Sequence, residues 1–403
     1  MTADPASGGP LAGIRIVDFT ENMAGPFGTM MLADQGADVV KVESPGGDAL
    51  RRRGTGTAEM SAYFANLNRS KRSLCLDLRH PRAAEVLGPL LDQADVVVQS
   101  FRPAAARRLR IDADAVCGKR PQLIYAAIAG FGTAGPWAGR PVYDHVVQAT
   151  SGMADQQRQD DTDPPRLIRH GLVDKATGYV LAQSVTAALL DRTRTHRGAQ
   201  LNIVMLDVAI SLLWPDGMMN HTALEPTVQG PAAALTFQLT PTADGHLSLI
   251  VLKQQYWDNL VAALGLASGL GEGARPGEIL RAARAVLKSM PTAAAADLLA
   301  AHDVPCAPVV AMPDVAAHPQ VIANQTLIEY SHPLLGQIRQ PRPVPSFPGV
   351  RAEDLRGAAQ LGADTAAVLA ALGLPGKTVN ALFASGVVQG APPPAGDQAE
   401  PPR

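Results

Sequence analysis

The sequence has few cysteines, no long apolar run and no basic leader. Its 403 residues include three cysteines, Cys75, Cys117 and Cys306, whose scattered positions fit neither a disulfide framework nor a zinc site. Reduced thiols and no bound metal are therefore expected. The longest apolar stretches fall short of the ~18 continuous apolar residues that a membrane span needs. Residues 1–10 lack the basic and apolar regions of a signal peptide. We therefore predict a cytoplasmic protein with no membrane partner.

Neither sign of charge is in excess. The 35 Lys and Arg residues and 37 Asp and Glu residues give a net charge of -2, which provides no basic surface for nucleic acid. Nucleotide-binding loops are also missing, because no predicted strand is followed by GxGxxG or GxxxxGK. The sequence therefore counts against a nucleic-acid-binding protein, a nicotinamide enzyme and an NTPase.

Apolar strand runs alternate with helical patterns through the first half of the chain. This alternation is typical of βαβ units, and it predicts an α/β fold with a mostly parallel, doubly wound sheet. The predicted strands are Ile14–Phe19, Asp38–Glu43, Asp95–Ser100 and Leu123–Ala129, and the predicted helices among them are Pro26–Asp34 and Arg82–Gln93. Ligands bind beyond the carboxyl ends of such strands. Residues 20–25, 43–47 and 100–103 are therefore the first candidates for a site.

The composition of the chain changes near residue 225. Before it, Ala199–Leu213 predicts a strand and a buried helix that Trp214 and Pro215 stop. After it, a hairpin turn is predicted at Thr242–His246. Helices are predicted at Gln255–Leu264, Pro276–Met290, Thr292–His302, Pro313–Ala323, Asp364–Leu372 and Pro375–Ser385. We assign residues 11–200 and 325–389 to a large domain, 225–315 to a smaller α/β domain, and 390–403 to a disordered, proline-rich tail.

One acidic residue, Asp174, lies in a glycine-flanked segment, Gly171–Gly178, directly before the apolar helical stretch Tyr179–Leu190. A carboxylate at the entry to a helix has two interpretations. As a helix cap it would accept hydrogen bonds from free backbone amides and stabilise the helix by ~1 kcal/mol. As a nucleophile it would attack an activated carbonyl. Residue preferences alone favour the cap.

Several segments, taken in order, carry a more specific signal. They are Leu11–Phe19 with Ala24–Pro26, Leu32–Glu43, Asn68–Leu78, Gly130–Pro136, Val142–Gly152, Gly171–Gly178, Val304–Val309 and His332–Gly336. Together they resemble the class III CoA-transferases, the family that includes formyl-CoA transferase and carnitine CoA-transferase. The resemblance extends over residues 11–389. One departure is Met23, where formyl-CoA transferase has a glutamine.

This resemblance implies a fold, a partner and a mechanism. It implies a Rossmann-like large domain built from both chain ends, a smaller α/β domain, and a homodimer whose subunits interlock. It also implies that Asp174 forms an anhydride with the acyl group and then a thioester with CoA, before an acceptor acid takes the CoA. The substrates would be a CoA thioester and a small carboxylic acid, with no permanently bound cofactor.

The resemblance also implies a set of coenzyme A contacts. These residues are Met23, Ala24, Leu76, Arg79, Ser100, Phe101, Arg102, Arg108, Arg140, Tyr143 and Asp144. The arginines would meet the CoA phosphates, and Phe101 would meet the adenine or pantetheine. The plain alternative is that the arginines, including Arg107, are solvated surface charges and that Phe101 belongs to the core.

Two other functions stay open. The first is that of α-methylacyl-CoA racemase, which shares the fold and has a His-Asp pair at the positions of Tyr143 and Asp144. A tyrosine of ordinary pKa is a poor base at neutral pH, so transfer is favoured, although His145 lies two residues along. The second is a non-catalytic CoA-binding protein, against which the retained Asp174 argues.

Overall fold

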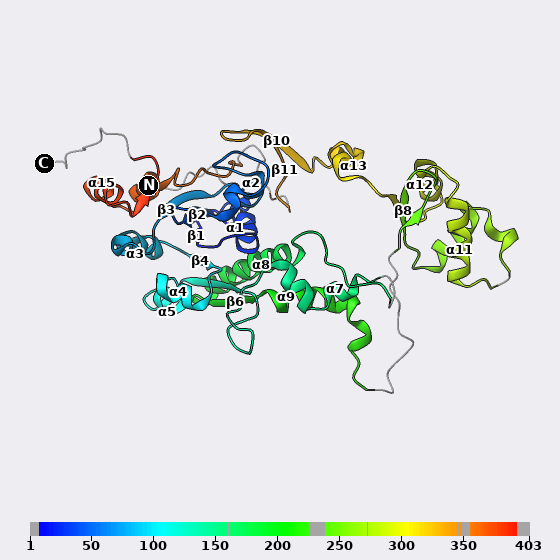
Figure 1. Cartoon of the computed structure of the whole chain (residues 1–403), viewed down its shortest axis with the longest axis horizontal. Coiled ribbons are helices and arrows are strands. Elements are labelled where there is room, and N and C mark those ends of the chain that lie inside the picture. Colours follow the sequence, from blue (N-terminus) through cyan, green and yellow to red (C-terminus); the bar gives the residue numbers. More distant parts are fainter. Residues whose placement is uncertain are drawn as a thin grey trace. The chain divides into compact units, whose positions relative to one another are not determined.

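The computed structural model describes residues 8–158, 162–225, 238–271, 273–344, 347 and 355–392. The chain divides into two compact units, and the first combines both ends of the chain. It comprises Met1–Pro226 and Leu327–Arg403, whereas the second is Thr227–Thr326. In Figure 1 the blue strands near the N-terminus and the red helix near the C-terminus both belong to the first unit.

A seven-stranded sheet forms the centre of the first unit, with the strand order β12-β3-β2-β1-β4-β5-β6. The strands are β1 (Arg15–Asp18), β2 (Asp38–Glu43), β3 (Arg72–Leu76), β4 (Val96–Gln99), β5 (Ile124–Ala129), β6 (Gln200–Val204) and β12 (Val388–Gln389). Strands β1 to β6 are parallel, and β12 pairs antiparallel with β3. The order 3-2-1-4-5-6 is that of a doubly wound sheet, in which the winding reverses between β1 and β4. The predicted α/β fold with a mostly parallel sheet is confirmed.

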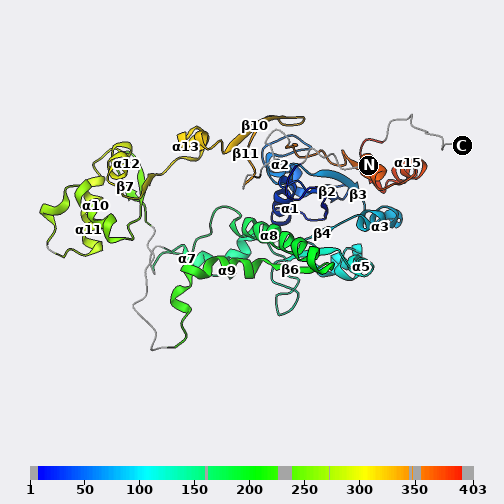
Figure 2. The ribbon, with the colours of Figure 1, turned by 180° about the vertical axis from the view of Figure 1, so that it is seen from behind.

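Helices pack on both faces of this sheet. Along β1, Ile16 contributes to one hydrophobic cluster and its neighbour Val17 to the other, as the alternation of side chains in a strand requires. The first-unit helices are α1 (Ala24–Asp34), α2 (Ala62–Asn68), α3 (Ala84–Asp92), α4 (Pro103–Leu109), α5 (Ala113–Cys117), α6 (Asp144–Thr150), α7 (Met153–Gln156), α8 (Leu172–Thr195), α9 (Met205–Gly217), α14 (Thr365–Ala371) and α15 (Gly376–Ala384). Figures 1 and 2 show α1 and α8 side by side.

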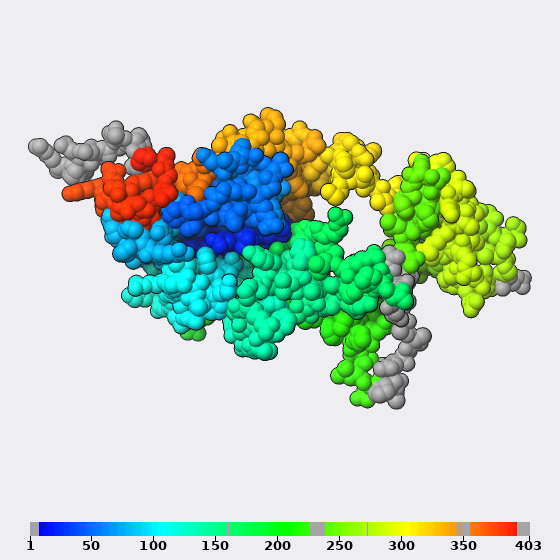
Figure 3. Space-filling model, in the orientation of Figure 1, coloured from blue at the N-terminus to red at the C-terminus, as the bar shows by residue number. Residues whose placement is uncertain are grey.

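The C-terminal helices α14 and α15 pack against the same sheet that contains the N-terminal strands. The guanidinium of Arg82, just before α3, donates a hydrogen bond of 2.8 Å to the Ala381 carbonyl oxygen of α15. In Figure 3 the red C-terminal residues lie against the light-blue residues of this region. The hairpin of β10 (Leu327–His332) and β11 (Gly336–Pro341) precedes these helices.

The second unit has its own small core. Its strands are β7 (Thr240–Pro241), β8 (His246–Leu249) and β9 (Cys306–Pro308), all antiparallel, and its helices are α10 (Gln254–Ala263), α11 (Pro276–Leu287), α12 (Thr292–Ala301) and α13 (Pro319–Ala323). The predicted hairpin between β7 and β8 is confirmed. Its turn residue Asp244 accepts hydrogen bonds from the backbone N–H (2.7 Å) and the hydroxyl (2.6 Å) of Thr292, which ties the hairpin to the start of α12.

Several element predictions were wrong, each for a local reason. Pro215 does not stop α9, which continues for two more residues to Gly217; the proline removes only its own N–H bond to the carbonyl of residue 211, and the helix ends within one turn of it. The single helix predicted at Pro313–Ala323 is divided in two, since His318 precedes a proline and is extended. Strand β3 and the β10–β11 hairpin were not predicted. Of the predicted disordered tail, residues 393–403 lie outside the described residues.

Candidate active site

Asp174 lies in the first turn of α8. The helix begins at Leu172, well before the predicted apolar stretch, and its N-cap residue is Gly171. Asp174 is therefore not the capping residue, and the capping interpretation was wrong. Among the hydrogen bonds of the described residues, none reaches the Asp174 carboxylate, although the side chain is half-buried. A carboxylate without donors is a better nucleophile than one whose lone pairs are occupied.

The surroundings of Asp174 disfavour its charge. Burial, and to a smaller extent the negative charge of Asp144, raise the pKa of Asp174 to about 7 against the opposing ammonium of Lys175. The carboxyl group is thus close to half ionised at neutral pH. A perturbed pKa of this kind is common at functional sites.

Asp144 is the second carboxylate of this site. It is buried at the start of α6, and its Oδ2 accepts a hydrogen bond of 2.9 Å from the backbone N–H of Asp174. Its Oδ1 accepts one of 2.5 Å from Nε2 of Gln148. Both oxygens are engaged inside the protein, so Asp144 acts on the site through α8. The neighbouring Tyr143 is 68% exposed.

The first turn of α1 brings Met23 to the same place. A Cβ atom built on Gly171 would lie 2.9 Å from Sδ of Met23 and 3.5 Å from Oδ2 of Asp174, so the three residues share one small space. Tyr63 of α2 packs in a cluster with Met23. Burial raises the pKa of Tyr63, and the charges of Asp174 and Asp144 raise it too. Nothing in the sequence around Tyr63 indicated that it lies beside Asp174.

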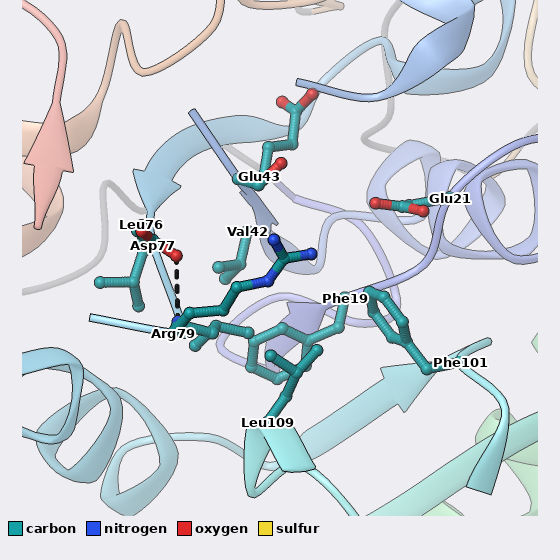
Figure 4. Close-up of a pocket in the computed structure, with 11 residues that line it drawn as sticks. Phe19, Glu21, Val42, Glu43, Leu76, Asp77, Arg79, Phe101 and Leu109 are labelled. Atoms are coloured by element: carbon teal, nitrogen blue, oxygen red, sulfur yellow. Dashed lines mark hydrogen bonds between the residues drawn. The ribbon is translucent and has the colours of Figure 1, made fainter. Parts of the chain in front are cut away.

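A pocket of about 90 Å³ opens at the carboxyl ends of β1 to β4. Three of the predicted CoA contacts, Leu76, Arg79 and Phe101, line it, together with Phe19 of the loop after β1. Figure 4 shows the Arg79 side chain extending across the pocket between Leu76 and Phe101, with the Phe19 ring beside it. An exposed guanidinium next to two aromatic rings suits an anionic ligand that carries a flat ring.

The remaining predicted contacts are more dispersed. The Ser100 hydroxyl accepts a hydrogen bond of 3.2 Å from the Glu21 backbone N–H, at the edge of the same pocket. Arg102 is the N-cap residue of α4, and Arg108 lies exposed in its last turn. The guanidinium carbon of Arg140 lies 4.4 Å from the centre of the Trp137 ring, on which it stacks. The structure thus brings Leu76, Arg79, Ser100 and Phe101 together, and separately places Met23 with Asp174 and Asp144.

Buried charges fix the loop between β1 and α1, and sequence reasoning missed them. The ammonium of Lys71 donates to Oδ2 of Asp18 (3.0 Å) and to the Pro26 carbonyl oxygen (2.9 Å), and Lys41 donates to the Thr20 carbonyl oxygen (2.7 Å). Burial by itself would raise the pKa of Asp18, but the charges of Lys71 and Lys41 hold it at about 2. Burial lowers the pKa of Lys71 to about 8. The hydrogen bonds of Lys71 and Lys41 therefore fix the loop that carries Met23.

The described ranges contain no cluster of three or more His, Cys, Asp or Glu side chains arranged to hold a metal ion. In the same part of the chain, no helix is both long and apolar enough to cross a membrane.

The family of the chain follows from comparison with known proteins. A family model for CoA-transferase family III matches residues 11–365. The chain therefore belongs to CoA-transferase family III, and it is an enzyme of that class. The resemblance identified from the sequence segments is confirmed.

Individual relatives support the same conclusion. The probable fatty acyl-CoA transferase Rv3272 of Mycobacterium tuberculosis is 36% identical over 280 residues, which cover 66% of this chain and 70% of the relative. The formyl-CoA:oxalate CoA-transferase of Shigella sonnei is 29% identical over 403 residues, covering 90% of this chain and 96% of the relative. The orthorhombic crystal structure of Rv3272 matches with a TM-score of 0.78 at 31% identity, covering 90% of this chain and 99% of that one.

Proposed function

We propose that this enzyme transfers coenzyme A from an acyl-CoA donor to a carboxylic acid through covalent intermediates on Asp174. A carboxylate oxygen of Asp174 attacks the thioester carbonyl, the C–S bond breaks, and CoA leaves as a thiolate. The thiolate then attacks the Asp174 carbonyl, which releases the donor's acid and leaves an aspartyl-CoA thioester. The acceptor carboxylate displaces CoA to form a second anhydride, and the returning thiolate forms the new acyl-CoA and frees Asp174.

The observation that carries this proposal is the state of Asp174 itself. Its carboxylate lies at the N-terminal turn of α8, half-buried and without hydrogen-bond donors among the described residues. Partial burial strengthens electrostatic effects and limits the water that would hydrolyse an anhydride. Free amides at the start of a helix favour the negative charge that develops on the reacting carbonyl.

We propose the pocket at the carboxyl edge of the sheet as the nucleotide end of the CoA site. Arg79, and Arg108 on the adjacent α4, would meet phosphates, and Phe101 would contact the adenine or pantetheine. Met23 and Ala24 would contact the thioester end beside Asp174. Because Met23 presents a thioether there, the site suits an acceptor with some apolar surface better than oxalate.

We also propose an interlocked homodimer in the cytoplasm. The support is the family resemblance together with the apolar surface that α8 leaves uncovered in the single chain. Tyr179 is 52% and Leu190 is 65% exposed, and both line a groove with Met31 of α1. Large apolar side chains grouped in this way are typical of subunit interfaces. Sedimentation analysis of the full chain would test the dimer.

The mechanism is tested by trapping the adduct. The enzyme is mixed with an acyl-CoA, quenched with hydroxylamine, digested, and analysed by mass spectrometry. We expect a hydroxamate at Asp174, since hydroxylamine cleaves both the anhydride and the thioester at the aspartyl carbonyl. Asp174→Asn is the matched control and should give neither adduct nor transfer. Transfer retained in Asp174→Asn or Asp174→Ala would overturn the assignment, as would transfer by the wild type without a hydroxamate at Asp174.

A further inference from the structure

Gln148 is a fully buried polar residue close to the site, and its amide is engaged at both ends. It lies on α6, one turn after Asp144, with 0% of its surface exposed. Its Oε1 accepts a hydrogen bond of 2.9 Å from the backbone N–H of Ile168. Its Nε2 donates to Oδ1 of Asp144 at 2.5 Å and lies 3.3 Å from the carbonyl oxygen of His170. Because an N–H faces Oε1, the amide orientation is fixed and Nε2 must point toward the carboxylate.

These bonds connect Gln148 to the nucleophile by two routes. Through Asp144, whose other oxygen accepts the Asp174 N–H at 2.9 Å, it is linked to the first turn of α8. Through Ile168 and His170, it holds the segment that immediately precedes the N-cap residue Gly171. One buried side chain thus fixes both the carboxylate that binds the start of α8 and the chain that enters it.

We propose that Gln148 is a positioning residue of this active site, which through Asp144 fixes the first turn of α8 and with it the carboxylate of Asp174. This inference rests on the proposed nucleophilic role of Asp174. Gln148 does not touch the reacting atoms. Small displacements of a reacting group are costly, since a misplacement of about 1 Å can lower a rate by ~100-fold.

Gln148 also sets the electrostatic environment of Asp174. The hydrogen bond from Gln148 holds the Asp144 carboxylate beside the first turn of α8, where its negative charge opposes the ionisation of Asp174. Lys175 on α8 acts in the opposite direction, and the phenol of Tyr63 on α2 is the third titratable group that faces the pair. Without this donor, Asp144 is no longer held in place, so its charge opposes the ionisation of Asp174 less. Asp174 is then expected to ionise at lower pH.

The test compares Gln148→Leu, which keeps the size but removes the amide, with Val147→Ala, a matched core change on the same helix that leaves the network intact. Gln148→Met is the second variant, in case Gln148→Leu does not fold. In the full-length enzyme we expect kcat to fall at least about tenfold in the Gln148 variants, with KM for acyl-CoA changed by less than about twofold. The acidic limb of the kcat profile should move to lower pH. Val147→Ala should lower thermal stability without either effect.

A second readout separates this inference from the proposed function. Labelling of Asp174 by a carbodiimide and an amine, followed by mass spectrometry across pH, reports its protonation without turnover. The midpoint should move to lower pH in Gln148→Leu even if Asp174 proves not to be the nucleophile. An unchanged kcat and an unchanged labelling midpoint would overturn the inference, as would an equal fall in kcat in Val147→Ala.

Discussion

Gly28 of α1 and Gly178 of α8 meet through their backbones. A Cβ atom on Gly28 would lie 2.7 Å from the Gly178 carbonyl oxygen, and one on Gly178 would lie 2.9 Å from the Ala24 carbonyl oxygen. Neither atom can move away as a flexible side chain would. This close approach holds the N-terminal turns of α1 and α8 together, and so places Met23 beside Asp174.

The first prediction is that Gly178→Ala separates the two helices. The added methyl would contact backbone atoms of α1, so we expect a loss of about 1–3 kcal/mol in the free energy of unfolding and a marked fall in transfer activity. Gly376→Ala is the control, because Gly376 lies in the first turn of α15 and, apart from its chain neighbours and its own helix backbone, nothing lies within 4 Å of its Cβ position. That change should be neutral or stabilising by about 0.5–1 kcal/mol. Equal stability of both variants, measured by denaturant unfolding, would contradict the close-packing argument.

The second prediction concerns the pH dependence of stability. The pKa of Asp174 is raised from 3.8 to about 7 in the folded protein, so the folded state binds this proton more tightly than the unfolded chain. The stabilising contribution is present below pH ~4 and is lost as pH rises to about 7. Asp174→Asn has no such titration. Its stability relative to the wild type should therefore rise between pH 5 and pH 8, by on the order of 2 kcal/mol. A constant difference across this range, measured by urea unfolding, would contradict the raised pKa.

The third prediction is that Arg79 binds the phosphates of CoA. Arg79→Met should raise KM for acyl-CoA several-fold, and the effect should be larger at low salt because exposed charges are screened. Arg108→Met should act in the same direction. Arg194→Met is the control, since Arg194 is an exposed arginine in the last turn of α8 that pairs with Asp191. If KM is unchanged in both test variants, these arginines are solvated surface charges.

The fourth prediction separates transfer from racemisation. Tyr143 is exposed, with no histidine in its place, so the enzyme should not exchange the α-proton of a 2-methylacyl-CoA. A single epimer is incubated in deuterated water and followed by NMR, with a carboxylic acid added as acceptor. Deuterium incorporation at the rate of turnover, with no transfer of CoA, would favour the racemase. Tyr143→His should then be examined for a gain of exchange, because it places a group of near-neutral pKa at this position.

The fifth prediction concerns the buried pair of Lys71 and Asp18. Lys71→Met leaves the Asp18 carboxylate buried without its partner at 3.0 Å, so it should destabilise the fold by about 3–5 kcal/mol. Combining it with Asp18→Asn removes the unpaired charge and should restore part of that loss. The free energies of unfolding of Lys71→Met and of the double variant are measured by denaturant titration. No recovery in the double variant would show that the loss comes from packing and not from charge.

The sequence by itself determined the α/β class, because apolar strand runs alternate with helical patterns through the first half of the chain, as in βαβ units. It also placed Asp174 at the start of a helix, and its ordered segments identified the family. It did not predict β3, since Arg72 and Ser73 interrupt the apolar run, and Arg72 pairs there with Asp38 of β2 at 2.5 Å. Local periodicity indicates which residues are buried but not which partner a charged residue pairs with across strands.

Only the tertiary structure decided the state of Asp174. Its carboxylate is without hydrogen-bond donors among the described residues because the N-cap of α8 is Gly171 and not Asp174. Residue preferences do not fix the start of a helix to within these three residues. Its raised pKa depends on burial and on Asp144, which lies 30 residues earlier in the chain and is held by Gln148. Such effects arise from atoms brought within a few ångströms by packing, and a single sequence does not contain those distances.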